Sequence, residues 1–527
     1  MKRSNLLWIT VLVLGWLFDF LFWGHAPGIN FALYVILCLG GGFLVLGLNG
    51  FKTTWRTLVL LAPILFFAAM TFIRQEPLSL FLAIACTLGL MGLLAASYLG
   101  GRWAWYSLAD YIFNAFKLVL SMIAAPLRFL IEGRKTATAQ QPAGTKPGAK
   151  RLWAVVRGVL IAIPIVVVFA ALLSSADLVF ARQVQDFVRL FRLENLPQYI
   201  FRGVYILIGA YALAGIFLHA AQKSRDEKLL GIDHPLLAPF LGFTEAAVVL
   251  GAVVLLFALF AIVQFRYFFG GQTNIGIQGY TYAEYARRGF SELVAVAFFS
   301  LLLFMGLSGI VQRTGATRRW VFSGLGLGMV ALVGVMLLSA FQRLVLYEAA
   351  YGFSRIRTYT HIFMIWLGVL LAVVVVLDIL QRERGFALAI LLTSLGFAVT
   401  LALINVDGFI VRQNVARAPE GEGLDVAYLA SLSSDSVPVL VAEFRDPSLP
   451  GLTRDAVGAV LVCHEQLSAN SADDDWRSFT LSTWRAEQSL GQVQGQLDHY
   501  RVVNQDWPIT ILTPGSVDYD CQQSGGM

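Results

Sequence analysis

The sequence predicts an all-α polytopic integral membrane protein with a small extramembrane domain at its C-terminal end. Of its 527 residues, 57% are apolar and only 14% are charged, which is outside the usual range of soluble domains. Apolar stretches of about twenty residues, the length that a bilayer-crossing helix needs, recur between Leu6 and Ile404. Beyond Ile404 these stretches stop, and proline, serine, aspartate and glutamine become common.

Hydropathy predicts roughly eleven membrane spans. They cover residues 6–23, 30–48, 57–72, 78–99, 153–173, 199–220, 240–267, 290–311, 320–344, 361–380 and 386–405. The first span has too long an apolar core for a signal peptide, and the WGHAPG that follows offers no cleavage site, so we expect it to stay in the mature chain.

One further segment, 111–131, is amphipathic and contains Lys117, Arg128 and an internal proline, Pro126. These features favour a helix lying in the membrane interface. Alanine, glycine, proline and threonine then dominate a flexible linker. We therefore expect a four-span block with the interfacial helix (1–131), a cytoplasmic linker (132–151), a seven-span block (152–405) and an acidic extracytoplasmic domain (406–527). A second amphipathic segment, 176–195, also suits an interfacial helix.

Lysine and arginine in short loops indicate the cytoplasmic side of a membrane protein. With the N-terminus inside, that side receives a consistent set of basic residues, namely Lys2, Arg3, Lys52, Arg56, Lys223, Arg225, Lys228, Arg313, Arg318, Arg319, Arg382 and Arg384. An odd number of spans then places the C-terminal domain outside the cytoplasm.

The C-terminal region differs from the rest of the chain in charge. Residues 406–527 contain 17 acidic residues and 7 arginines with no lysine, a net charge of −10, whereas residues 1–405 carry +16. Candidate helices lie at 424–433, 453–470 and 476–497, which predicts a mixed, mainly helical domain. Cys463 and Cys521 are its only cysteines and would form a disulfide in an oxidising exterior, the alternative being two free thiols.

Two polar stretches interrupt the apolar blocks. In the first, 266–292, TYAE matches a capping box that starts a helix at Thr281. That helix places charged residues one turn apart beside aromatic ones, namely Glu284, Tyr285, Arg287, Arg288 and Glu292.

In the second polar stretch, 343–361, Arg343, Tyr347 and Tyr351 recur every four residues around Glu348, at the end of a span. Gly352 is a natural helix stop. Ser354 can cap the next helix, which would begin with Arg355 and Arg357 and enter the membrane at His361. In the expected topology both stretches lie at the outer face and form a collar of arginine, glutamate and tyrosine.

Two interpretations of this collar remain open. The tyrosines can anchor spans at the interface while arginines and glutamates pair with each other. Alternatively, because the arginines outnumber the glutamates and guanidinium groups suit phosphate and carboxylate, the collar can bind an anionic ligand such as a lipid headgroup.

Other motifs offer little chemistry. The GLGLG run from Gly324 to Gly328 lies inside a span and indicates a small-residue helix contact. No Walker sequence, HExxH or nucleophile elbow is present. His464 and Glu465 in the tail have too few further ligands near them for a metal site, so we expect no metal, no cofactor and no nucleic-acid partner.

Several motifs resemble a bacterial polytopic membrane family catalogued as domain of unknown function 4173. They are RYFFGG, TYAEYARRGFSELVAVA, LYEAAYGFSRIRTY, DGFIVRQNVAR and LDVAYLASLSSDSVPVL, and the resemblance covers about residues 199–440. It implies a multi-pass protein of a bacterial inner membrane and assigns no activity, substrate or catalytic residue.

Three functional hypotheses follow. The sequence favours a non-enzymatic envelope or regulatory protein whose acidic C-terminal domain binds a protein partner. The first alternative is a transporter or lipid-handling protein that binds anionic headgroups of membrane lipids at the collar. The second is a membrane enzyme acting on an anionic lipid, with Glu284, Glu292 or Glu348 as its base.

Overall fold

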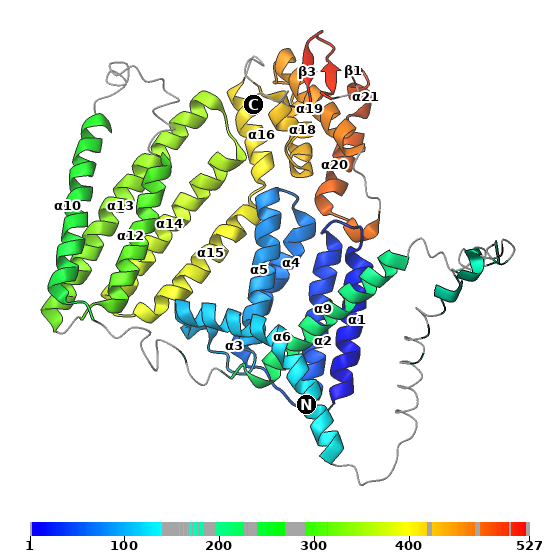
Figure 1. Cartoon of the computed structure of the whole chain (residues 1–527). Coiled ribbons are helices and arrows are strands. Elements are labelled where there is room, and N and C mark those ends of the chain that lie inside the picture. The colour runs from blue at the N-terminus through cyan, green and yellow to red at the C-terminus, as the bar shows by residue number, and fades with distance from the viewer. Residues whose placement is uncertain are drawn as a thin grey trace. The chain divides into compact units, whose positions relative to one another are not determined.

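A computed structural model describes residues 3–139, 196–225, 229, 240–268, 290–312, 315–418, 424–469, 475–504 and 507–522, with scattered positions between 158 and 183. Within these residues, eleven helices are long and apolar enough to cross a membrane (Figure 1). The prediction of an all-α polytopic membrane protein is confirmed.

The helices of the first part of the chain follow the predicted spans closely. They are α1 (Ser4–Phe22), α2 (Ile29–Leu48), α3 (Trp55–Leu58), α4 (Leu61–Ile73), α5 (Pro77–Ala96), the 3₁₀ turn η1 (Trp103–Trp105), α6 (Leu108–Ala139) and α9 (Leu196–Gln222). The predicted linker and the amphipathic segment 176–195 lie almost entirely outside the described residues.

Two segments bear on the number of spans. Residues 108–132 of α6, which the sequence analysis interprets as interfacial, are among the eleven helices of sufficient length and hydropathy. The predicted span at 153–173 is described only at scattered helical positions. The number eleven thus agrees with the prediction, but the two sets differ by one member.

The later helices are α10 (Phe243–Phe268), α12 (Phe290–Ile310), α13 (Ala316–Tyr351), α14 (Arg355–Ile379), η5 (Glu383–Gly385) and α15 (Phe386–Leu403). A shared apolar core joins α10, α12, α13 and α14. Within it a side chain on Gly326 would overlap the Phe304 ring, so the predicted close helix contact in the glycine run is present at this position.

A head domain, residues 406–522, follows the last membrane helix. Its helical elements are α16 (Val406–Arg417), α17 (Val426–Ala430), η6 (Ser434–Ser436), α18 (Val437–Phe444), α19 (Gly451–Ala469), η7 (Trp476–Ser478), α20 (Leu481–Gly491) and α21 (Gln494–Leu497). Three short strands, β1 (Arg501–Asn504), β2 (Thr510–Leu512) and β3 (Asp518–Asp520), form an antiparallel sheet in the order β1-β2-β3. The head domain is therefore mainly helical with a small sheet.

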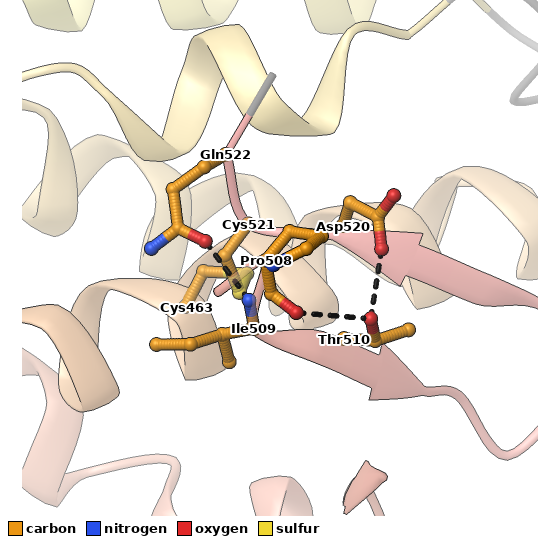
Figure 2. The surroundings of a disulfide bond; sticks show 7 residues. All are labelled: Cys463, Pro508, Ile509, Thr510, Asp520, Cys521 and Gln522. Atoms are coloured by element: carbon orange, nitrogen blue, oxygen red, sulfur yellow. Dashed lines mark hydrogen bonds between the residues drawn. A yellow bond between two sulfur atoms is a disulfide. The ribbon is translucent and has the colours of Figure 1, made fainter. Parts of the chain in front are cut away.

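The disulfide joins α19 to the end of the sheet. The sulfur atoms of Cys463 and Cys521 lie 2.01 Å apart, and both residues are buried (Figure 2). Beside them the backbone N–H of Cys521 donates to the carbonyl of Ile509, and Ile509 N–H donates to the Gln522 side chain at 2.9 Å. The two cysteines therefore connect the helical part of the head domain to its strands.

The chain divides into two compact units. The first contains residues 1–23, 41–50 and 118–219, and the second contains residues 24–40, 51–117 and 220–527. The head domain belongs to the second unit, together with α4, α5 and α10 to α15. All contacts described below for the head domain lie within this unit.

Candidate functional site

An ion pair between the start of α14 and the start of α16 lies at the base of the head domain. The guanidinium of Arg355 donates from Nε and Nη2 to the two carboxylate oxygens of Asp407, at 2.8 and 2.7 Å. Ser433 donates to the same carboxylate from its backbone N–H at 2.8 Å and from its hydroxyl at 2.6 Å. Asp407 is 0% exposed, so this bidentate pair offsets the cost of a fully buried charge.

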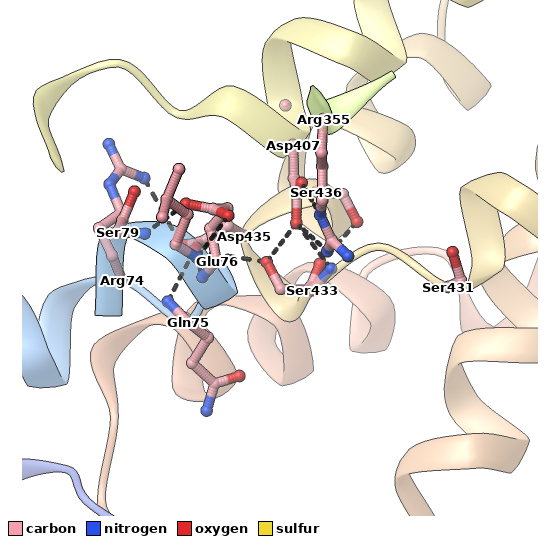
Figure 3. Close-up of polar contacts among 12 residues, drawn as sticks. Arg74, Gln75, Glu76, Ser79, Arg355, Asp407, Ser431, Ser433, Asp435 and Ser436 are labelled. Carbon is pink, nitrogen blue, oxygen red and sulfur yellow. Dashed lines mark hydrogen bonds and ion pairs between the residues drawn. The ribbon is translucent and has the colours of Figure 1, made fainter. Parts of the chain in front are cut away.

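A second buried carboxylate, Asp435, holds the loop between α4 and α5. Its side chain accepts from the backbone N–H of Gln75 at 2.7 Å and of Glu76 at 3.1 Å (Figure 3). Arg74 lies 3.5 Å from the other oxygen and also donates to the carbonyls of Ala402 and Leu403 at the end of α15. One loop of four residues thus connects α4, α5, α15 and the head domain.

The third buried carboxylate belongs to Glu76, which caps α5. It accepts from the backbone N–H of Leu78 at 2.8 Å and of Ser79 at 2.7 Å, and Pro77 occupies the first turn of the helix. A carboxylate at a helix N-terminus is stabilised by the exposed N–H groups and by the helix dipole. The hydroxyl of Tyr359, one turn into α14, also donates to this carboxylate.

We call these interactions the clasp. It consists of Arg74, Gln75, Glu76, Arg355, Tyr359, Asp407, Ser433 and Asp435. Each of the three carboxylates has several hydrogen-bond donors, as buried charges require. An apolar core continues beneath the clasp, since Ile362 of α14 and Leu401 of α15 belong to the same buried cluster as the interior of the head domain.

The head domain also contacts the loop before α2. The backbone N–H of Ile29 donates to the Phe479 carbonyl at 3.0 Å. A Cβ atom on Gly28 would stand 2.7 Å from that same carbonyl oxygen, so only glycine permits this approach. Beside it, the amide of Gln75 donates to the hydroxyls of Thr480 and Thr483, both at 2.9 Å.

Burial near the clasp perturbs two titratable side chains of the head domain. Desolvation lowers the pKa of His464 to about 4, against the smaller opposing effects of a hydrogen bond with the Leu429 backbone and the charge of Asp407. Desolvation also raises the pKa of the Tyr428 hydroxyl, which accepts a hydrogen bond from Arg355 N–H. The region behind the clasp is therefore dry and of low polarity.

The structure gives internal partners to two arginines of the predicted collar. Arg355 belongs to the clasp, and Arg357 donates to the carbonyls of Tyr351 and Gly352 at the end of α13. The Arg357 guanidinium also lies 4.2 Å from the ring centroid of Tyr347. These contacts match the structural interpretation, in which collar charges and rings satisfy one another.

The helix boundaries in this stretch are as predicted. Gly352 ends α13 with a positive φ of 78°, and α14 begins at Arg355 after Ser354. The Ser354 side chain makes no capping hydrogen bond, although capping was its predicted role. Arg343 lies two turns before the end of α13.

In the first polar stretch, residues Glu284, Tyr285, Arg287 and Arg288 lie outside the described residues. Glu292 lies in the first turn of α12. The structure therefore does not test whether the two stretches come together.

A second buried polar pair lies between α13 and α14. Nδ1 of His361 is 3.4 Å from Oε1 of Glu348, and the Phe341 ring packs 4.4 Å from the imidazole. Glu348 is 2% exposed. Among the described residues, neither Oε1 of Glu348 nor Nε2 of His361 has a hydrogen-bond partner. This pair thus has unused hydrogen-bonding capacity, unlike the clasp.

The sequence analysis missed three of the acidic residues in the clasp, Glu76, Asp407 and Asp435. One signal could have found the first, because an acidic residue before proline and an apolar run is a typical helix start. The other two have no local signal, since their partners lie 52 and 361 residues away. No group of three or more metal-ligating side chains occurs in the described part of the chain.

The comparison with protein families corrects the expected resemblance. The family model that matches is DUF4153, a domain of unknown function, over residues 61–443, so the predicted resemblance to domain of unknown function 4173 is wrong. The match also begins much earlier than residue 199, and it includes α4, α5 and the whole clasp. No curated protein and no solved structure matches the chain. The chain belongs to the DUF4153 family.

Proposed function

We propose that this protein is a non-enzymatic envelope or regulatory protein of a bacterial inner membrane, whose head domain binds a protein partner outside the cytoplasm. The observation that carries the proposal is the clasp. Buried ion pairs and hydrogen bonds join the head domain to α4, α5, α14 and α15, so that these parts move together. A partner bound to such a head domain can bias the arrangement of the membrane helices.

Contacts at the helix ends support an odd number of spans. Just after α5, the backbone N–H groups of Leu99 and Gly100 donate to the side chain and carbonyl of Ser224, just after α9. Both helices therefore end on one side of the membrane and start on the other. An odd number of crossings must lie between them, and two candidates exist, 108–132 and 153–173. Only one of the two crosses.

Packing of α6 against α9 favours 153–173 as the crossing segment. Three consecutive residues of α6, 121–123, contact Tyr211, Gly215 and His219 of α9. Those three positions extend over about 12 Å of α9, whereas 121–123 cover only about 3 Å of α6. The two helices therefore cross steeply, as expected of an interfacial helix meeting a span.

Charge supports an outward-facing head domain. The helix ends away from the head domain carry the basic loop residues Lys52, Arg56, Arg318, Arg319, Arg382 and Arg384. Basic loops mark the cytoplasmic side. The acidic head domain with its disulfide is then on the opposite, oxidising side.

Site-specific photo-crosslinking in cells tests this function. A benzophenone amino acid is introduced at Leu452 or at Val503, both exposed in the head domain, and at Leu255 of α10 as a membrane-facing control. We expect a discrete protein adduct at head positions alone. Its yield should fall several-fold when Asp407→Ala breaks the clasp while the disulfide still forms. Absence of any head-specific adduct would contradict the proposal.

One observation favours transport as a second candidate function. Glu348 and His361 form a buried pair within about three turns of the helix ends, and each has an unpartnered atom among the described residues. Intramembrane carboxylates and histidines of this kind occur in proton relays and ion pathways. The occupied guanidinium groups of Arg355 and Arg357 give less support to binding of anionic headgroups.

Proton movement across reconstituted vesicles tests the transport candidate. Vesicles with an internal pH-sensitive dye are exposed to a pH step, and wild type is compared with Glu348→Gln. Transport predicts a proton leak above that of empty vesicles, abolished in the variant. The matched control is Glu245→Gln, since Glu245 caps the other end of its own helix. Equal traces for wild type and empty vesicles would remove this candidate.

A further inference from the structure

Three large aromatic side chains are exposed on one edge of the head domain. Trp476 is 55% exposed, Phe479 39% and Trp484 47%. They lie on η7, on the residue after it, and on the first turn of α20, within nine residues of sequence. A protein surface in water rarely gathers three such rings without a partner.

Hydrogen bonds fix the position of this aromatic edge relative to the membrane helices. Phe479 bonds to Ile29 at the start of α2. Thr480 and Thr483, which flank the first turn of α20, bond to Gln75 between α4 and α5. Because these residues stand where spans begin and end, the aromatic edge lies at the level of the helix termini.

At that level the surrounding medium is the headgroup region of the bilayer. Tryptophan is enriched there because its ring is apolar and its N–H can still bond to headgroups or water. The local charges are compatible with this location, since Arg477 pairs with Asp475 at 2.5 Å. An acidic head domain would gain little from electrostatic attraction to anionic lipids, so its attachment to lipid must be apolar.

We propose that Trp476, Phe479 and Trp484 insert into the headgroup region of the lipid leaflet beside the head domain. This lipid-binding edge is distinct from the arginine collar and does not depend on which side of the membrane the head domain occupies. It makes lipid a third support of the head domain, after the clasp and the loop before α2. The head domain is thereby held flat on the membrane.

Fluorescence quenching by spin-labelled lipids tests the proposal. Trp484→Cys and, separately, Trp476→Cys are made in a Cys38→Ala/Cys86→Ala background and labelled with an environment-sensitive fluorophore. The proteins are studied in phosphatidylcholine nanodiscs containing a lipid with a nitroxide near its headgroup. Trp507→Cys is the matched control, because Trp507 is 73% exposed before β2, at the end of the head domain away from α4 and α5 (Figure 1).

We expect lipid quenching at positions 476 and 484 to be at least threefold stronger than at 507, with emission shifted to the blue. Equal lipid quenching at all three positions would overturn the proposal. A label at 484 that is shielded from a water-soluble quencher but not quenched by lipid would also overturn it, because protein would then cover the edge. The mobility shift of the Cys463–Cys521 disulfide on reduction verifies folding of each variant.

Discussion

Two buried polar clusters meet the same helix, α14, and they differ in how their hydrogen-bonding capacity is used. In the clasp, the carboxylates of Glu76, Asp407 and Asp435 each accept two or more hydrogen bonds. In the pair of Glu348 and His361, one atom of each side chain has no partner among the described residues. Both clusters bury charge, but only the first is satisfied.

This difference indicates different roles. A fully bonded network stabilises one arrangement and resists change, since every partner lost leaves another group unsatisfied. A cluster with unused capacity costs stability, and proteins keep such groups where they bind or move something. The clasp therefore reads as attachment, and the pair of Glu348 and His361 as the better place to look for chemistry.

The largest effect should come from breaking the ion pair of the clasp. Asp407→Ala leaves Arg355 half-buried without its carboxylate and removes both bonds from Ser433. We expect the free energy of unfolding to fall by about 3–5 kcal/mol, as for other buried pairs that lose one partner. Thermal unfolding in detergent measures it. Asp518→Ala, at an exposed position of β3, is the control, and an equal effect of both substitutions would contradict the structural role of the clasp.

Acidification should weaken the head domain through His464. Its folded pKa of about 4 lies below the model value of 6.5, so the unfolded chain takes up a proton first as pH falls. Stability is fully present above pH 6.5 and declines towards pH 4, by up to about 3 kcal/mol. Unfolding midpoints between pH 7 and pH 4 measure the decline. His464→Gln should flatten it, and an unchanged slope in this variant would assign the pH dependence to other groups.

A smaller effect is expected where the clasp loses a neutral donor. Tyr359→Phe removes the hydroxyl that donates to Glu76 but leaves the two backbone donors of that carboxylate. The cost should be about 1–2 kcal/mol. Tyr351→Phe is the matched control on an exposed ring, and it should change the unfolding midpoint little. A larger loss in Tyr351→Phe than in Tyr359→Phe would be inconsistent with the comparison.

The smallest effect on stability should come from the unsatisfied pair. Glu348→Gln removes a buried charge that has no bonded partner at Oε1, so the free energy of unfolding should change by less than about 1 kcal/mol or rise. The same unfolding assay measures it beside Asp407→Ala. If both variants lose similar stability, the contrast between the two clusters disappears.

Local sequence patterns predicted the membrane helices and the turn between α13 and α14 well. Span length, Gly352 as a helix stop and Arg355 as a helix start all depend on neighbouring residues. The three strands of the head domain were not predicted, because strands of three or four residues leave too short an alternation to detect. The structure also adds α16 and α18, which no predicted helix covered.

The partners of the collar arginines could not be predicted in the same way. Helical spacing tells which residues share a face of one helix, but it does not tell which residue elsewhere in the chain faces them. Arg355 pairs with Asp407, and Arg74 lies beside Asp435, across 52 and 361 residues. Such pairings depend on the tertiary fold, and the prediction of an anion-binding collar arose from seeing arginines without their carboxylates.

The close approach at Gly28 has a consequence for comparing relatives of this chain. Any side chain at this position would push against the backbone of Ser478 and Phe479, so the glycine is needed only while the head domain rests there. In homologues that end before the segment equivalent to residues 475–484, this constraint is absent. We therefore expect glycine at this position to be inherited together with that segment and to vary freely where it has been lost.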